Sequence, residues 1–153
     1  MVTEKIIAFL DSIGISVVKT KISQDTFLPG IIINKGIIEY DPQLLKYPGD
    51  LLHEAGHIAV LAPQDRKKVA GDLRDYQTPS ESDELGAILW SYAALTYLNI
   101  APEIVFHENG YKNNSQWLID QFENGTYIGL PYLEWKGMTD QQIFPKVHRW
   151  LAQ

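Results

Sequence analysis

The stretch Asp50 to Leu61 reads DLLHEAGHIAVL and places two histidines and a glutamate inside a short apolar run. Its apolar residues recur at helical spacing, so the stretch predicts an amphipathic helix with Asp50 as N-cap that ends before Pro63. His53 and His57 are four residues apart and therefore share one helix face, where two imidazole nitrogens can meet one cation. The pattern predicts a helix that supplies two ligands to a metal ion.

Glu54 gives this pair the H-E-x-x-H spacing that is typical of zinc peptidases. The residue is rotated by about 100° from His53 around the helix. It is therefore expected to reach a water on the metal without being a ligand itself. Ala55 and Gly56 are small and allow a second helix to approach closely. The alternative interpretation is a pair of partly buried histidines that bind no metal.

The third ligand is expected on the next helix, which the sequence predicts from Ser80 to Leu98. Catalytic zinc takes three protein ligands and keeps one position open. Because the chain has no cysteine, the third ligand must be His, Asp or Glu. Glu84 is expected to look inward toward the histidines. Glu81, nearer the start of the helix, stays open as the alternative, and Asp83 faces away from Glu84 and suits a cap or a supporting role.

The segments LLHEAGHIAVL (51–61) and ESDELGAILWSYAALTYL (81–98) together resemble the gluzincin pattern. Within that group they are similar to the small ImmA/IrrE-type metallopeptidases, over about residues 31–98. The resemblance implies zinc ligation by His53, His57 and Glu84, with Glu54 as general base. In that family the third ligand stands in an E-A-N-like segment, whereas Leu85-Gly86 follows it here. The resemblance supplies the expected fold, a zincin-like domain.

In that family the strand before the active helix forms the edge along which an extended substrate lies. The corresponding residues here are Ile37 to Tyr40. A peptide is therefore expected to add to the sheet there by strand pairing.

The rest of the chain predicts a single α+β domain over residues 1–153, with a short mixed or antiparallel sheet beside the motif helix and a second core helix. Helices are expected at 3–13, after Pro42, at 114–122 and at 140–151, strands at 15–20, 31–33 and 37–40, and irregular structure at 127–135. The polar residues 64–79 are expected to form a loop with a short helical turn.

Charge and composition narrow the possible partners. The net charge is −6, which disfavours a nucleic-acid-binding surface. The N-terminus lacks the basic start of a signal peptide, and the uncharged run Leu85 to Pro102 contains polar residues and is interpreted as a core helix rather than a membrane span. A cytoplasmic location and a peptide or protein substrate are expected, while the oligomeric state is left open.

A further donor is expected to stabilise the oxyanion that forms during hydrolysis. His107 is the first candidate, followed by Tyr111 and Tyr92, whereas His148 is expected on the surface. The leading hypothesis is a zinc-dependent metallopeptidase in which Glu54 activates a metal-bound water. The alternatives are a regulatory or binding module that keeps the metal site without turnover, and a structural domain without metal.

Overall fold

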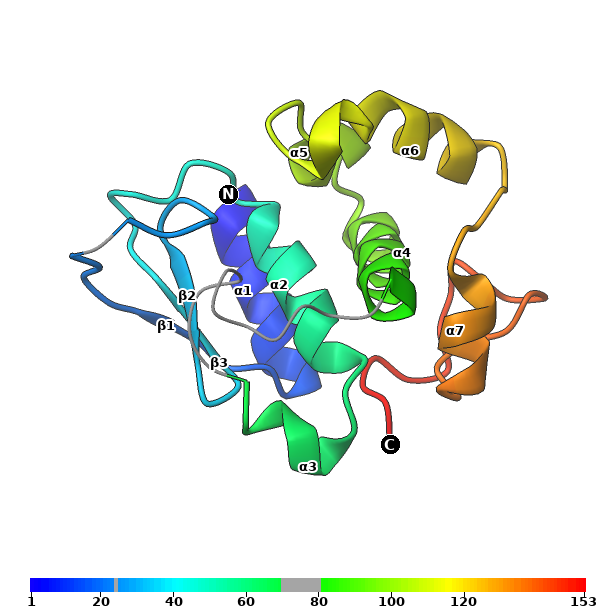
Figure 1. Cartoon of the computed structure of the whole chain (residues 1–153), viewed down its shortest axis with the longest axis horizontal. Coiled ribbons are helices and arrows are strands. Elements are labelled where there is room, and N and C mark those ends of the chain that lie inside the picture. Colours follow the sequence, from blue (N-terminus) through cyan, green and yellow to red (C-terminus); the bar gives the residue numbers. More distant parts are fainter. Residues whose placement is uncertain (24, 70–80) are drawn as a thin grey trace.

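The computed structural model describes residues 1–23, 25–69 and 81–153 and has an α+β architecture (Figure 1). Its elements are α1 (Val2–Ile13), β1 (Val17–Lys19), β2 (Ile31–Asn34), β3 (Ile37–Tyr40), α2 (Asp50–Ala59), α3 (Pro63–Arg66), α4 (Glu81–Leu98), α5 (Pro102–Val105), the 3₁₀ turn η1 (Tyr111–Asn113), α6 (Ser115–Glu123) and α7 (Leu130–Trp135).

The three described strands form one mixed sheet in the order β1-β3-β2. β2 and β3 are an antiparallel hairpin, and the two residues between them, Lys35 and Gly36, have φ of 51° and 79°, as a type I′ turn requires. β1 joins the other side of β3 in parallel. The expectation that Ile37–Tyr40 is an edge strand is therefore wrong, because both of its sides are already hydrogen-bonded. The free edges of the described sheet belong to β1 and β2.

The motif helix α2 lies at the centre of the molecule, with α1 and the sheet on one side and α4 on the other (Figure 1). All ten of its residues are buried. On α4, the residues that follow Glu84 at helical spacing, Ile88, Ser91 and Leu95, are buried as well. Burial on this scale is what fixes the position of the two helices, since apolar contact is the main force that holds them together.

Gly56 allows α2 and α4 to lie almost backbone to backbone. A Cβ atom at this position would stand 2.7 Å from the carbonyl oxygen of Ala87 on α4. Only a residue without a side chain fits there, so this glycine sets how closely the start of α4 can approach the histidines.

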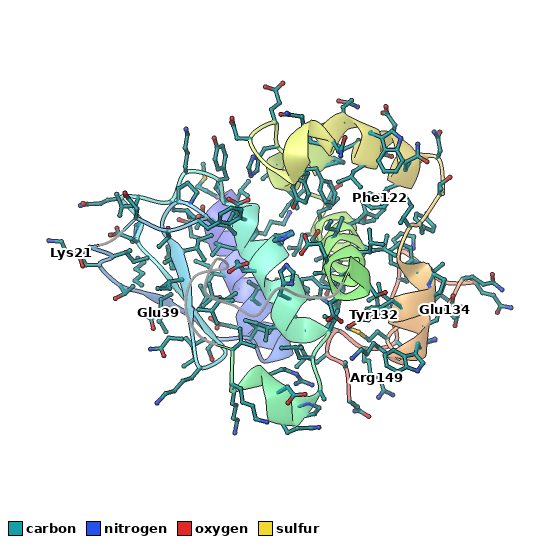
Figure 2. All side chains as sticks on the ribbon, viewed as in Figure 1. Lys21, Glu39, Phe122, Tyr132, Glu134 and Arg149 are labelled. Atoms are coloured by element: carbon teal, nitrogen blue, oxygen red, sulfur yellow. The ribbon has the colours of Figure 1, made fainter. Side chains whose placement is uncertain are left out.

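α5, α6 and α7 cover the far side of α4 (Figure 1). Phe122 of α6 packs on Tyr92 of α4 with 5.0 Å between ring centroids, and the hydroxyl of Tyr132 on α7 donates to Asp83. Figure 2 shows these two aromatic side chains directed toward α4, while Lys21 and Arg149 lie at the periphery. None of the helices in the described ranges is long and apolar enough to cross a membrane.

Two predicted helices are absent from the described structure. The predicted helix at 140–151 is wrong: this segment consists of turns and bends. Pro145 supplies no N–H and its ring clashes with a helical backbone, and the carboxylate of Asp140 accepts the backbone N–H groups of Gln142 and Ile143 in a local turn. The helix expected after Pro42 is also replaced by turns.

Smaller differences concern the ends of helices and the short helices α5 and α7, which were not expected. α2 has Gly49 at the N-cap position, so Asp50 is its first residue and does not cap it. α7 occupies part of the segment that was expected to be irregular. The predicted cap Ser80 lies outside the described residues, as does most of the predicted loop, although α3 accounts for the expected short helical turn.

Replacing Gly56 by alanine tests the close packing of α2 against α4. Helix propensity alone favours alanine by about 1 kcal/mol. The contact with the Ala87 backbone should reverse that sign and lower the free energy of unfolding by about 1–3 kcal/mol. Urea denaturation of the two proteins measures the difference, and a more stable variant would show that the helices have room to spare.

Asp41 provides a test of pH-dependent stability. Its Oδ2 accepts the Ile22 N–H at 3.0 Å and its Oδ1 accepts the Gln43 N–H at 2.9 Å. These bonds, the one from Ile22 above all, lower the pKa of the Asp41 carboxyl below its usual value. A lowered folded pKa stabilises the protein above the unfolded pKa and loses that effect as pH falls through the folded value.

We therefore expect Asp41→Asn, which has only one acceptor oxygen, to be less stable than the wild type at neutral pH. The difference should shrink as pH falls below about 4, the usual pKa of aspartate, because the unfolded chain takes up its proton there before the folded protein does. Thermal denaturation of both proteins at neutral pH and at a pH below about 4 measures the difference in stability. A pH-independent difference would contradict the role of the charge.

Candidate metal centre

The buried helix α2 carries more polar side chains than an apolar environment tolerates without partners. Asp50, His53, Glu54 and His57 are all buried, and Glu54 and His57 are only 2% and 3% exposed. Buried ionisable groups are costly unless they are hydrogen-bonded, paired or bound to a metal. The neighbours of these four side chains therefore define what the helix can do.

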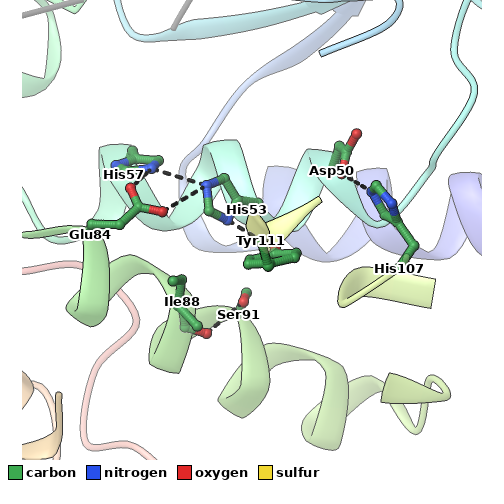
Figure 3. Close-up of polar contacts among 8 residues, drawn as sticks. All are labelled: Asp50, His53, His57, Glu84, Ile88, Ser91, His107 and Tyr111. Carbon is green, nitrogen blue, oxygen red and sulfur yellow. Dashed lines mark hydrogen bonds and ion pairs between the residues drawn. The ribbon is translucent and has the colours of Figure 1, made fainter. Parts of the chain in front are cut away.

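His53, His57 and Glu84 come together as the sequence predicted (Figure 3). The Nε2 atoms of the two histidines are 3.2 Å apart. The Glu84 carboxylate faces both, with Oε2 at 3.0 Å from Nε2 of His57 and Oε1 at 3.5 Å from Nε2 of His53. The three residues can each offer one ligand atom, and these atoms lie within 4.8 Å of one another.

These separations fit a tetrahedral zinc site. Two nitrogens bound to one tetrahedral ion at about 2.0–2.1 Å lie about 3.3 Å apart, close to the distance between the two Nε2 atoms. Two imidazoles and one carboxylate are also a donor set that catalytic zinc uses. The side chain of Glu84 is 39% exposed, whereas His57 is almost fully buried. The cluster is therefore exposed to solvent at Glu84, the residue that α4 contributes.

The electrostatic environment treats the two histidines differently. Burial, together with the neighbouring His57, lowers the pKa of His53 to about 4, although Glu84 opposes this. Burial also lowers the pKa of His57, but the hydrogen bond to Glu84 and the charges of Glu84, Glu54 and Asp83 outweigh it and raise the pKa above its usual value. Acid groups thus favour a positive charge at the cluster, and a cation bound there would replace the proton of His57.

Glu54 lies beside the cluster and outside the set of three candidate ligands. Its negative charge contributes to raising the pKa of both His57 and Tyr111. The carboxylate is thus near enough to act on these groups. This placement agrees with the expectation that Glu54 accompanies the metal ligands without being one.

His107 lies beside α2 at Asp50, one helical turn before His53. Its Nε2 is 2.7 Å from Oδ1 of Asp50 (Figure 3). Its ring stacks on Tyr47 with 3.9 Å between centroids. Burial is the main reason why the pKa of Asp50 is raised, with His107 opposing it. The structure thus shows a carboxylate–imidazole pair at His107, and its role toward an oxyanion stays a prediction.

The other candidate donors occupy different places. The hydroxyl of Tyr111 is 3.1 Å from Nδ1 of His53, on the ring edge away from the cluster. Tyr92 packs among aromatic rings that include Phe122. His148 is exposed, as expected, and contacts Asp140.

The residues that the sequence analysis misassigned are those that support the motif helix. Asp50 was predicted to be a cap, and its contact with His107 was missed. The available signal that Asp50 belongs with the site was its three-residue spacing from His53, which puts both side chains on one face of the helix. The contact between Tyr111 and His53 joins residues 58 apart in the chain, and no local pattern announces it.

Comparisons with protein-family models, curated proteins and solved structures found no match for this chain. The resemblance to the gluzincins therefore rests on the motif residues of the sequence alone.

Glu84→Gln and Glu81→Gln form a matched pair that tests the third ligand. Both remove one negative charge from the first turn of α4. Glu84→Gln should weaken zinc binding roughly 100-fold or more, since even residues that only support a ligand typically contribute 10–100-fold. Glu81→Gln should bind zinc as the wild type does. Competition titration against a chelator measures both affinities, and the reverse order would make Glu81 the ligand.

Proposed function

We propose that this protein is a zinc-dependent peptidase with a zincin-like catalytic domain. The observation that carries the proposal is the meeting of His53, His57 and Glu84. Glu54 lies on α2, the helix that carries the two histidines. The H-E-x-x-H spacing places the two histidines and Glu54 on one helix, and the close approach of α4 brings Glu84 to the histidines. Zinc is preferred to harder cations because two of the three donors are imidazoles.

Each residue has a defined task in this proposal. His53, His57 and Glu84 would hold the zinc ion, which would supply Lewis acidity to the substrate carbonyl and to the attacking water. Glu54 would accept a proton from that water and deliver it to the leaving amine. The carboxylate is buried, which keeps it from being solvated by bulk water and favours proton transfer within the site.

The proposed substrate is a peptide or an unfolded segment of a protein. It would reach the cluster from the side of Glu84, the most exposed of the three ligands. Backbone pairing with the middle strand β3 is blocked by its two neighbours. If the substrate adds to the sheet, it must use the outer side of β1 or β2.

Glu54→Gln tests the proposed chemistry. The variant should keep stoichiometric zinc, because Glu54 is not a ligand, and should lose roughly 100- to 10,000-fold of the cleavage rate. Cleavage of a defined mixture of unstructured peptides, followed by mass spectrometry, measures the rate. Glu103→Gln, an exposed residue of α5, is the matched control and should cleave like the wild type.

Three results of this experiment are informative. Equal cleavage by the wild type and Glu54→Gln would exclude the general-base role. Stoichiometric zinc without cleavage of any peptide by the wild type would favour the alternative of a binding or regulatory module that retained the metal site. A wild-type protein that binds no zinc would refute the metal centre itself.

A further inference from the structure

Tyr111 contacts the one ring nitrogen of His53 that points away from the cluster. Its hydroxyl oxygen is 3.1 Å from Nδ1, and the two rings meet edge to face with centroids 5.4 Å apart (Figure 3). A neutral imidazole carries one proton, on either Nδ1 or Nε2, and the hydrogen bond at one nitrogen decides the state of the other. The contact with Tyr111 at Nδ1 is therefore linked to whether Nε2, the nitrogen that faces Glu84, carries a proton.

The atom through which His53 would bind a metal decides where the proton of this ring has to lie. Nε2 of His53 is 3.2 Å from Nε2 of His57 and 3.5 Å from Oε1 of Glu84, so it is the nitrogen that faces the cluster. A histidine binds a metal through a ring nitrogen that carries no proton. A neutral His53 that binds through Nε2 therefore carries its proton on Nδ1, where the Tyr111 oxygen can accept it.

The backbone at Tyr111 is held in an uncommon conformation that brings this hydroxyl to His53. Its φ is +59°, in the left-handed region that aromatic residues rarely occupy. Backbone in that region is strained for an aromatic residue and persists only where its surroundings enforce it. The pairing of His107 with Asp50 and the contact of Phe106 with Tyr111, at 5.2 Å between centroids, anchor the segment that leads into Tyr111.

We propose that Tyr111 is a positioning residue that fixes the tautomer of His53, so that the lone pair of Nε2 faces His57 and Glu84. The role is to prepare one ligand of the proposed zinc site before the ion arrives, and it therefore rests on the proposed function. Asp50 and His107 serve it indirectly, because they fasten the segment that carries Tyr111 to the same helix face, one turn before His53. Partners of this kind typically contribute 10- to 100-fold to metal affinity.

The test compares Tyr111→Phe with Tyr127→Phe. Both changes remove one hydroxyl from a partly buried tyrosine in an edge-to-face aromatic contact. Nitrogen-15 NMR of the imidazoles in the metal-free protein at neutral pH reports which nitrogen of His53 is protonated. The wild type and Tyr127→Phe should show the proton on Nδ1, and Tyr111→Phe should show a mixture of tautomers. Tyr111→Phe should also bind zinc 10- to 100-fold more weakly, and Tyr127→Phe should bind it normally.

A wild-type His53 protonated on Nε2 would overturn the assignment, and this measurement needs no variant to fold. Unchanged zinc affinity and an unchanged tautomer in Tyr111→Phe would also overturn it while leaving the proposed metal site intact. Failure of the wild type to bind zinc would refute the proposed function instead. The ring-proton measurement would then still decide whether Tyr111 controls the tautomer of His53.

Discussion

The close contact between α2 and α4 is the constraint on which the candidate site depends. The two histidines on α2 provide only two of the three candidate ligands, and a different helix has to bring the carboxylate of Glu84 to them. Gly56 makes this possible, because its missing side chain leaves space for the backbone at Ala87. Ala87 lies less than one helical turn after Glu84, so the tightest point of the packing also fixes the position of Glu84.

Three polar side chains of α2 form a row, and each of them contacts a different part of the chain. Asp50 meets His107, His53 meets Tyr111, and His57 meets Glu84. Each partner reduces the cost of burying a polar group in an apolar setting. The row also holds the segment after α5 against the motif helix. The architecture around the site is thus stabilised in part by the same side chains that give it its chemistry.

The sequence predicted the local features where one physical signal dominated. α1 ends at Gly14, which adopts the left-handed conformation that only glycine enters freely, and the β2–β3 hairpin forms around Gly36. The C-terminal segment was predicted wrongly because helical spacing of apolar residues outweighed Pro145 in the interpretation. There the chain is held by hydrogen bonds to distant segments. The Trp150 carbonyl accepts the indole N–H of Trp90, and the Ala152 N–H donates to the Ala59 carbonyl.

The sequence by itself determined the histidine pair, the adjacent Glu54 and a short set of acidic candidates, because spacing along a helix fixes which residues share a face. Tertiary structure alone decided that Glu84 meets the two histidines, that β3 is a middle strand, and that Tyr111 contacts His53. These outcomes depend on contacts between segments far apart in the chain. Such contacts are selected by the packing of the whole core, which no local pattern encodes.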